Sequence, residues 1–278
     1  MSNMNKLNIE ERSRVIKALA EGNSLRATAR TTGTARMTLE KLLRDISAAC
    51  IRYQDEHLRN LACKRIQCDE IWSFLYAKQK NLPADKKGQF GYGDVWTWVA
   101  IDADTKLAVS WLVADRSASS AFALMDDLAS RLSHRIQLTT DGHRVHLDAV
   151  ESAFGAGIDY PTLVKIYGSD RESEATYSPA KCIGSRCVPI VGRPDPKHIS
   201  NSFVERQNLT TQMSMRRFTR LTNAFSKKVD NHMQSVALHF MYYNFVRIHQ
   251  TLRITPAMAA GIADKVWEIE DVIALLSN

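Results

Sequence analysis

The sequence predicts an α/β protein with a mixed sheet, preceded by a small all-α unit that contains a helix-turn-helix. Apolar residues recur at helical spacing through the first 46 residues. From about residue 65 the pattern changes to strand-like runs rich in Ile, Val, Trp and Thr, arranged around a hairpin turn. A helical segment then separates the hairpin from the next strand. Strands and helices in this order favour a layered fold with a mixed sheet.

The N-terminal segment predicts three short helices. Residues 9–21 have apolar side chains at helical spacing, Ser24 is placed to cap a second helix, and Gly33 is placed to end it. Thr34 is placed to cap a third helix over residues 35–46. Two short helices joined by a tight glycine-containing turn are typical of a helix-turn-helix. Its predicted DNA contacts are the polar residues of the third helix: Arg36, Thr38, Lys41 and Arg44. A three-helix packing unit without DNA contacts is the alternative.

Four segments follow from these patterns: residues 1–46 (helix-turn-helix), 47–64 (helical connector), 65–260 (catalytic α/β domain) and 261–278 (helical tail). Strands are predicted in "KRIQCDEIWSFLYAK", on both sides of the turn "DADTK", and in "RIQLTTD". The stretch "SSAFALMDDLASRLSH" predicts a helix. Because "KCIGSRCVPIVGRPDPKHIS" contains two glycines and three prolines, it predicts a loop that leads into a further helix.

Charge is distributed unevenly along the chain. Residues 1–65 contain 13 basic and 7 acidic residues, and residues 197–253 contain 9 and 2, whereas residues 66–196 contain 14 and 17. Clustered positive charge is expected for a nucleic-acid partner, and an acidic region within it suits a divalent cation. Solvated faces of an ordinary protein would account for the charge equally well. We expect double-stranded DNA as the partner.

The five cysteines favour a reducing compartment, because their number is odd and their spacing forms no disulfide framework. Cys182 and Cys187 have no second ligand pair of zinc-site spacing. No apolar run approaches the roughly 20 residues that span a bilayer. We therefore expect a cytoplasmic protein without a membrane partner.

Three acidic residues are the candidate catalytic residues. Asp69 lies within the first strand, Asp141 follows the strand "RIQLTT", and Glu205 lies in a helix after the predicted loop. A carboxylate inside an apolar strand is costly unless it is compensated. Glu70 would point to the opposite face of the strand from Asp69, and Asp102 lies at the hairpin turn, so we rank both lower.

A two-metal site explains these acids. Hard oxygen ligands from separate elements hold two Mg²⁺ ions about 4 Å apart, for which Mn²⁺ is expected to substitute. Asn201 and Asn208 lie on the same helical face as Glu205, and with Arg206 they are the expected supporting residues. Nearby arginines are expected to contact the DNA backbone: Arg216, Arg217 and Arg220. Alternatively, Asp69 faces solvent on an edge strand, Asp141 serves only the turn, and Glu205 pairs with Arg206.

At these residues the chain resembles a DDE-class insertion-sequence transposase, most closely the family of the first-described bacterial insertion element. The resemblance rests on "DEIWSF", the hairpin "VWTWVAIDADTKLAVSWLVADRS", "TTDG", and "VERQNL" followed by "FSKK" and "HFMYYNFVRIHQTL". The stretch "YNFVRIHQTLRITPAMAAG" is similar to the C-terminal end of many integrase-like catalytic domains. The match covers about residues 66–260.

The resemblance implies an RNase H-like fold with Asp69, Asp141 and Glu205 as the Mg²⁺-binding catalytic residues. It implies hydrolysis at the ends of a mobile element, followed by attack of the freed 3′-hydroxyl on target DNA. A bacterial, nucleoid-associated protein is then expected, acting as a homodimer or higher assembly on DNA. Members of that family often have a cysteine-based zinc-binding segment near the N-terminus, but here no cysteine precedes Cys50.

Two other functions remain open. A helix-turn-helix regulator with an inactive RNase H-like domain would bind DNA without cutting it. A DNA nuclease would cut without strand transfer. The integrity of the carboxylate site and the joining of DNA ends separate these functions from a transposase.

Overall fold

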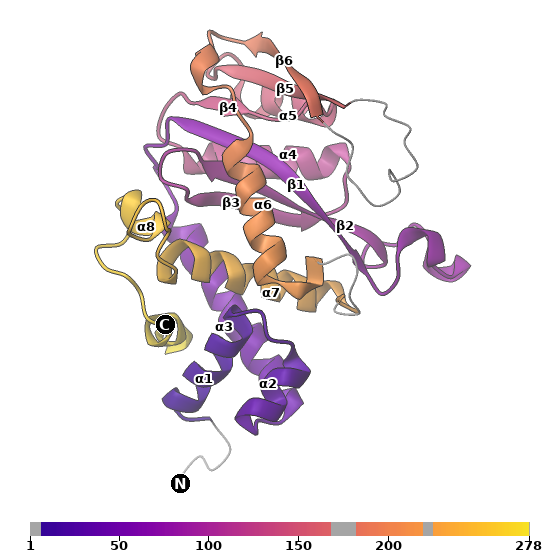
Figure 1. Cartoon of the computed structure of the whole chain (residues 1–278), viewed down its shortest axis with the longest axis vertical. Coiled ribbons are helices and arrows are strands. Elements are labelled where there is room, and N and C mark those ends of the chain that lie inside the picture. Colours follow the sequence, from indigo (N-terminus) through magenta and orange to yellow (C-terminus); the bar gives the residue numbers. More distant parts are fainter. Residues whose placement is uncertain (1–6, 168–181, 219–224, 278) are drawn as a thin grey trace.

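The computed structural model describes residues 7–167, 182–218 and 225–277. Its N-terminal helices lie at one end of the molecule and a mixed sheet lies at the other (Figure 1). A long helix, α3, runs from the N-terminal group to the sheet. The prediction for Arg220 concerns a residue outside the described ranges.

The N-terminal helices are α1 (Ile9–Ala20), α2 (Leu25–Thr32) and α3 (Arg36–His57). Ser24 caps α2 by accepting the backbone N–H of Ala27, and Gly33 ends it at φ 70° in the left-handed region. The predicted cap at Thr34 is wrong, because Ala35 is the N-cap of α3 and no side chain bonds there. The predicted third helix continues through most of the connector because apolar residues recur at helical spacing beyond Ile46.

The central sheet is mixed, as predicted. Within the described residues its order is β3-β2-β1-β4, in which β1 pairs antiparallel with β2 and parallel with β4. Isolated parallel bridges place β5 beside β4. This arrangement fits the RNase H-like fold that the resemblance implies. The bounds are β1 Arg65–Leu75, β2 Gly93–Asp102, β3 Ala108–Ala114, β4 Gln137–Thr139 and β5 Tyr160–Tyr167.

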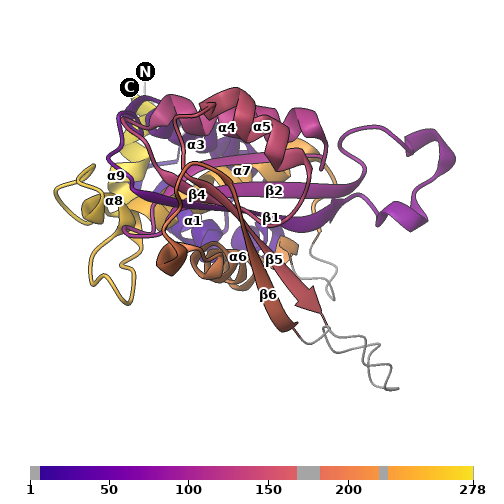
Figure 2. The ribbon, with the colours of Figure 1, turned by 90° about the horizontal axis from the view of Figure 1, so that it is seen from above.

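The predicted loop after residue 180 is wrong in its first part. Residues Cys182–Val191 form strand β6, which pairs antiparallel with β5 in a two-stranded ribbon. Valine and isoleucine in "CIGSRCVPIV" favour a strand, and Pro189 is tolerated because β6 has an open edge. Cys182 and Cys187 are both exposed and free on this strand. Figure 2 shows β5 and β6 side by side, projecting away from the sheet.

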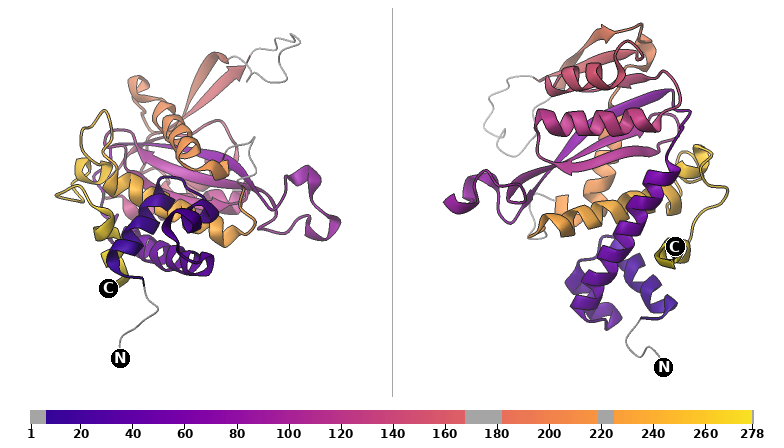
Figure 3. Two further views of the ribbon diagram at one scale, coloured as in Figure 1. Left: turned by 60° about the horizontal axis from the view of Figure 1, so that its bottom comes forward. Right: turned by 180° about the vertical axis from the view of Figure 1, so that it is seen from behind.

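Helices cover both faces of the sheet (Figure 3). Alternation along β2 directs Trp98 and Ala100 to the cluster that includes α4 and α5, and Val99 and Ile101 to the cluster that includes α6 and α7. Asp69 lies opposite Val99 on the neighbouring strand and therefore faces the side of the sheet that α6 and α7 cover. The helix bounds are α4 Ala118–Arg131, α5 Val145–Phe154, α6 Ser202–Ser214 and α7 Val229–Met241.

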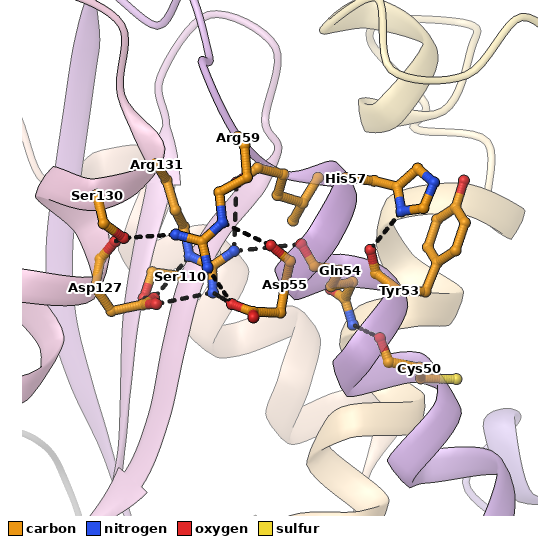
Figure 4. A network of polar contacts seen from close by, with 11 residues as sticks. Cys50, Tyr53, Gln54, Asp55, His57, Arg59, Ser110, Asp127, Ser130 and Arg131 are labelled. Atoms are coloured by element: carbon orange, nitrogen blue, oxygen red, sulfur yellow. Dashed lines mark hydrogen bonds and ion pairs between the residues drawn. The ribbon is translucent and has the colours of Figure 1, made fainter.

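Polar contacts join α3 to the sheet layers (Figure 4). The Arg131 guanidinium, from α4, bonds to Asp127 on its own helix at 2.7 and 2.8 Å and to Asp55 on α3 at 3.1 Å. It also donates to the backbone carbonyls of Gln54 and Leu58, each at 3.3 Å. One buried arginine therefore holds the end of α3 against α4.

The C-terminal part returns to the N-terminal helices. A π-helical turn, η5 (Tyr242–Val246), follows α7, and two short helices, α8 (Pro256–Ala259) and α9 (Ile269–Ala274), complete the chain. The last of these packs against α1 (Figure 1). Across the described ranges, no helix has both the length and the apolar character needed to cross a bilayer.

Candidate active site

The structure brings Asp69, Asp141 and Glu205 to one pocket. Asp69 comes from the middle of β1, Asp141 from the segment after β4, and Glu205 from the first turn of α6. All three line a pocket of about 440 Å³, which Asn201 and Lys165 also line. β1 is an interior strand, although its pairing with β4 ends at Gln67, just before Asp69. The Asp69 carboxylate faces α6, where it accepts a hydrogen bond from Asn208, so the alternative of a solvent-facing edge residue does not apply.

A buried glutamine positions the start of α6. Gln67 lies two residues before Asp69 on β1, and its Oε1 accepts the backbone N–H groups of Phe203 at 2.9 Å and Val204 at 3.1 Å. These N–H groups have no partner within the helix itself. The contact fixes the helix N-terminus against β1, one residue before Glu205.

Asn208 supports Asp69 directly. Its Nδ2 donates a hydrogen bond to Asp69 Oδ2 at 2.8 Å, from one turn after Glu205 on α6. Asn201 is 4 % exposed and lines the same pocket as the carboxylates. Its Oδ1 is buried and accepts no hydrogen bond from the described part of the chain. This buried amide oxygen therefore lies where a cation or an ordered water is expected to bind it.

The turn after β4 holds Asp141. Its Oδ1 accepts the backbone N–H of His143 at 3.0 Å, and its Oδ2 lies 3.7 Å from Nη2 of Arg116. A Cβ atom at Gly142 would lie 2.5 Å from Cγ2 of Val164 on β5. The glycine of "TTDG" therefore permits the close approach of β5 to the turn.

Glu70, which we ranked below the three candidate acids, lies beside them, and we call Asp69, Glu70, Asp141 and Glu205 together the carboxylate cluster. One oxygen from each of Asp69, Glu70 and Asp141 lies within 4.8 Å of the others. The Glu70 side chain is directed toward α5, where His146 Nε2 lies 2.8 Å from Oε1, and Arg116 donates to Oε2 at 3.2 Å. Its position beside Asp69 inside an apolar strand carries the same burial cost, and that signal would have identified it.

The electrostatics of the cluster favour a cation. Burial raises the pKa of Asp69 to about 7, and the charges of Glu70, Asp141 and Glu205 act in the same direction. Burial also opposes ionisation of Glu70, but the hydrogen bond from His146 and the charges of His146 and Arg116 outweigh it and lower the pKa. The cluster thus contains one carboxyl that ionises readily only when further positive charge is present.

Lys165 places a positive charge beside Glu205. It lies on β5, and its Nζ forms an ion pair with Glu205 Oε1. The alternative pairing of Glu205 with Arg206 is not observed among the described contacts. Because β5 was not predicted, sequence reasoning had no signal for Lys165.

The residues around the cluster fit a divalent metal ion. Asp69, Asp141 and Glu205 offer carboxylate oxygens from three separate elements, and the unpartnered Asn201 Oδ1 adds a neutral oxygen. Oxygen donors of this kind are the ligands that Mg²⁺ and Mn²⁺ prefer. A raised pKa such as that of Asp69 is expected where several carboxylates meet, and a bound cation would lower it.

Two other predicted residues lie elsewhere. Arg206 is exposed on a different face of α6 and lines a separate pocket, so it does not support the carboxylates. Asp102 is 1 % exposed, and its carboxylate accepts the backbone N–H groups of Asp104 and Thr105 at 3.3 and 3.2 Å. It is a residue of the hairpin turn, as its position in "DADTK" indicated.

The Arg217 guanidinium, a predicted DNA contact, is held by hydrogen bonds within the protein. Its Nη1 donates to Ser226 Oγ at 2.6 Å and to the backbone carbonyl of Asn231 at 3.2 Å. Burial lowers its pKa to about 10. The side chain therefore joins the segment after α6 to the start of α7, while the neighbouring Arg216 is exposed.

The predicted recognition residues lie in the first turns of α3. Arg36, Lys41 and Arg44 are exposed, whereas Thr38 is half-buried. Arg36 pairs with Glu40 at 2.7 Å, and Arg44 lies 3.8 Å from Asp45. Exposed pairs of this kind contribute little and can be exchanged for phosphate contacts. Contact between these residues and DNA stays a prediction.

Comparisons with known proteins give a distant likeness. No protein-family model and no curated protein matches the chain. Solved structures similar to it include the Mos1 strand transfer complex and a pre-cleavage Mos1 transpososome, each 12% identical with a TM-score of 0.25. The Mos1 mariner paired end complex with Mn is also 12% identical, with a TM-score of 0.22.

The matched region is partial in both directions. The first two alignments cover 58% of this chain and 60% and 61% of the Mos1 chains, and the manganese complex is covered to 58% by 55% of this chain. The chain therefore spans about three fifths of the length of the structures it resembles.

Proposed function

We propose that this chain is a DNA transposase of the DDE class, which binds the ends of a mobile element, cuts a strand and joins the freed 3′-hydroxyl to target DNA. The observation that carries the proposal is the convergence of Asp69, Asp141 and Glu205 from β1, the β4 turn and α6 on one pocket. Asp69, the most buried of the three, carries a cost of desolvation that a bound cation would offset.

Asp69, Asp141 and Glu205 would hold Mg²⁺, with Mn²⁺ as a substitute. When bound, such ions activate a water or a 3′-hydroxyl and stabilise the leaving oxygen of a phosphodiester. Asn208 keeps Asp69 oriented through its hydrogen bond, and Gln67 keeps α6 in register with β1. His146 and Arg116 hold Glu70 in its charged form at the rim of the cluster.

Double-stranded DNA is the proposed partner. The exposed cations of α3 would contact the ends of the element, and Arg216 would contact the backbone near α6. Because transposition joins two ends, we expect at least two copies of the chain on DNA. A regulator with an inactive domain and a nuclease without strand transfer are the competing functions.

The test is a cleavage and strand-transfer assay with Mg²⁺ or Mn²⁺ on DNA that carries the sequences flanking the gene. We expect joined products with the unmodified protein, loss of at least about a hundredfold in Asp141→Asn, and little change in the control Asp148→Asn, which alters an exposed acid on α5. Cleavage without joining would favour the nuclease. Specific binding without cleavage would favour the regulator.

A further inference from the structure

A second pocket lies on the other side of α6 from the carboxylate cluster. It has a volume of about 410 Å³, within the range of small-ligand sites. Its walls are α6, the β2–β3 hairpin turn and the turn that follows η5. The residues that the argument uses are Lys106, Arg206, Gln207, Arg247 and His249. We call this site the basic pocket.

The basic pocket gathers positive charge without a compensating acid in its walls. Three cationic side chains, those of Lys106, Arg206 and Arg247, line it, and the described lining contains no aspartate or glutamate. Burial lowers the pKa of His249, and the charges of Lys106, Arg247 and Arg206 lower it further. These effects show that the three cations act on the same small volume.

An unpartnered amide points to a ligand. Gln207 is 2 % exposed and lines the basic pocket, yet its Nε2 donates no hydrogen bond to any described residue. Nδ1 of His249, on the facing wall, is also buried without a described partner. Buried polar atoms are rarely left unsatisfied, and the Gln207 amide nitrogen is a donor, so a hydrogen-bond acceptor is expected between these walls.

The walls are fixed in place. Lys106 has a left-handed backbone at φ 63°, its Nζ lies 3.3 Å from the centre of the Phe203 ring, and its backbone carbonyl accepts the Tyr243 hydroxyl at 3.0 Å. Arg247 directly follows η5, and its N–H bonds to the carbonyl of Tyr242 at 2.9 Å. Single π-helical turns occur frequently at functional sites.

We propose that the basic pocket binds a phosphate of the DNA backbone. An anion with several acceptor oxygens satisfies the cations and the Gln207 amide together. The assignment to DNA rests on the proposed function. A helix with its side chains is about 10–12 Å across, so a strand that crosses α6 would place this phosphate roughly three base-pair steps from the carboxylate cluster. The pocket would then hold the strand in register for cutting.

The first experiment measures DNA affinity against salt concentration by fluorescence anisotropy with a labelled duplex. In Arg206→Gln/Arg247→Gln we expect about tenfold weaker binding and a salt slope reduced by about 0.9, the value for one phosphate contact. The control Arg52→Gln/Lys64→Gln removes the same charge from exposed positions outside this pocket and should change both quantities less. Equal effects in the two variants overturn the assignment to a backbone phosphate.

The second experiment uses inorganic phosphate and does not depend on the proposed function. Phosphate, compared with chloride at equal ionic strength, should raise the melting temperature of the unmodified protein, and this rise should be lost in Arg206→Gln/Arg247→Gln and reduced in Gln207→Met. Stabilisation without any DNA binding would support the pocket as an anion site and contradict the proposed function. Equal stabilisation of all variants overturns the pocket itself.

Discussion

At the scale of single residues, Asp69 shows most directly how the surroundings act on the carboxylates. It lies among three other carboxylates, and burial together with their charges raises its pKa to about 7. The carboxyl of an unfolded chain ionises near pH 3.9. Because the folded state binds this proton more tightly, stability decreases as pH rises between these two values, and the full cost is present above pH 7.

Asp69→Asn should therefore stabilise the metal-free protein. We expect a rise in melting temperature of about 2–4 °C at pH 8, corresponding to about 1 kcal/mol, and a smaller rise at pH 5. Addition of Mn²⁺ should stabilise the unmodified protein and not the variant. Melting curves with EDTA and with Mn²⁺ test this, and destabilisation by Asp69→Asn at pH 8 would contradict it.

Asn208 acts by orienting Asp69 rather than by charge. Loss of its hydrogen bond in Asn208→Ala should lower the rate of strand cleavage about 10- to 100-fold and raise the Mn²⁺ concentration needed for half-maximal rate. Met213→Ala, at a position of α6 that is 75 % exposed and away from the carboxylates, is the control on the same helix. Titration of the cleavage rate with Mn²⁺ distinguishes this positioning role from a purely structural one, which would change stability alone.

At the scale of elements, the position of α6 relative to β1 determines the site. Gln67→Leu would leave two N–H groups at the start of α6 without an acceptor. We expect a loss of about 1–3 kcal/mol in the free energy of unfolding and slower cleavage, because Glu205 follows these residues directly. Urea unfolding measures the first effect, and a stability equal to that of the unmodified protein would contradict it.

Local patterns in the sequence predicted many of the elements. The hairpin around Asp102, the strand of Asp69 and the capped start of α2 depend on neighbouring residues, and the structure has all three. The ribbon of β5 and β6 was missed, because its strands pair across a long connection and its glycine and prolines indicate a loop. Lys165 was missed with it.

Strand alternation gave the direction of Glu70 and not the position of its oxygens. The side chain leaves the opposite face from Asp69, but both carboxylates lie within reach of Asp141, because β4 ends before this point in the sheet. A one-dimensional pattern contains no information on where a neighbouring strand ends. Arg206 directly follows Glu205 in the sequence, but neighbouring residues of a helix point about 100° apart, so it faces another pocket.

At the scale of the whole molecule, Arg131 connects the N-terminal helices to the sheet. Arg131→Ala would leave two carbonyls of α3 and the carboxylates of Asp55 and Asp127 without this partner. We expect a loss of about 1–3 kcal/mol in the free energy of unfolding, since two carbonyls at the end of α3 lose their hydrogen-bond donor. Arg135→Ala, which removes a more exposed pair with Asp159, should cost less.

Hydrogen exchange would locate the effect of Arg131→Ala. Amide protection should fall most in the second half of α3 and least in β1 and β2, because the arginine holds the helix end and not the centre of the sheet. Uniform loss of protection through the chain would contradict this coupling role.

The central claim is that the carboxylate cluster binds divalent metal ions for strand cutting and joining. The most direct measurement is anomalous diffraction from crystals soaked in Mn²⁺ at a concentration that supports cleavage. We predict one or two strong peaks at roughly 2.0–2.2 Å from oxygens of Asp69 and Asp141, with Glu205 released from Lys165 to join them. Crystals that show no peak at these carboxylates, or show peaks only elsewhere, would contradict the account.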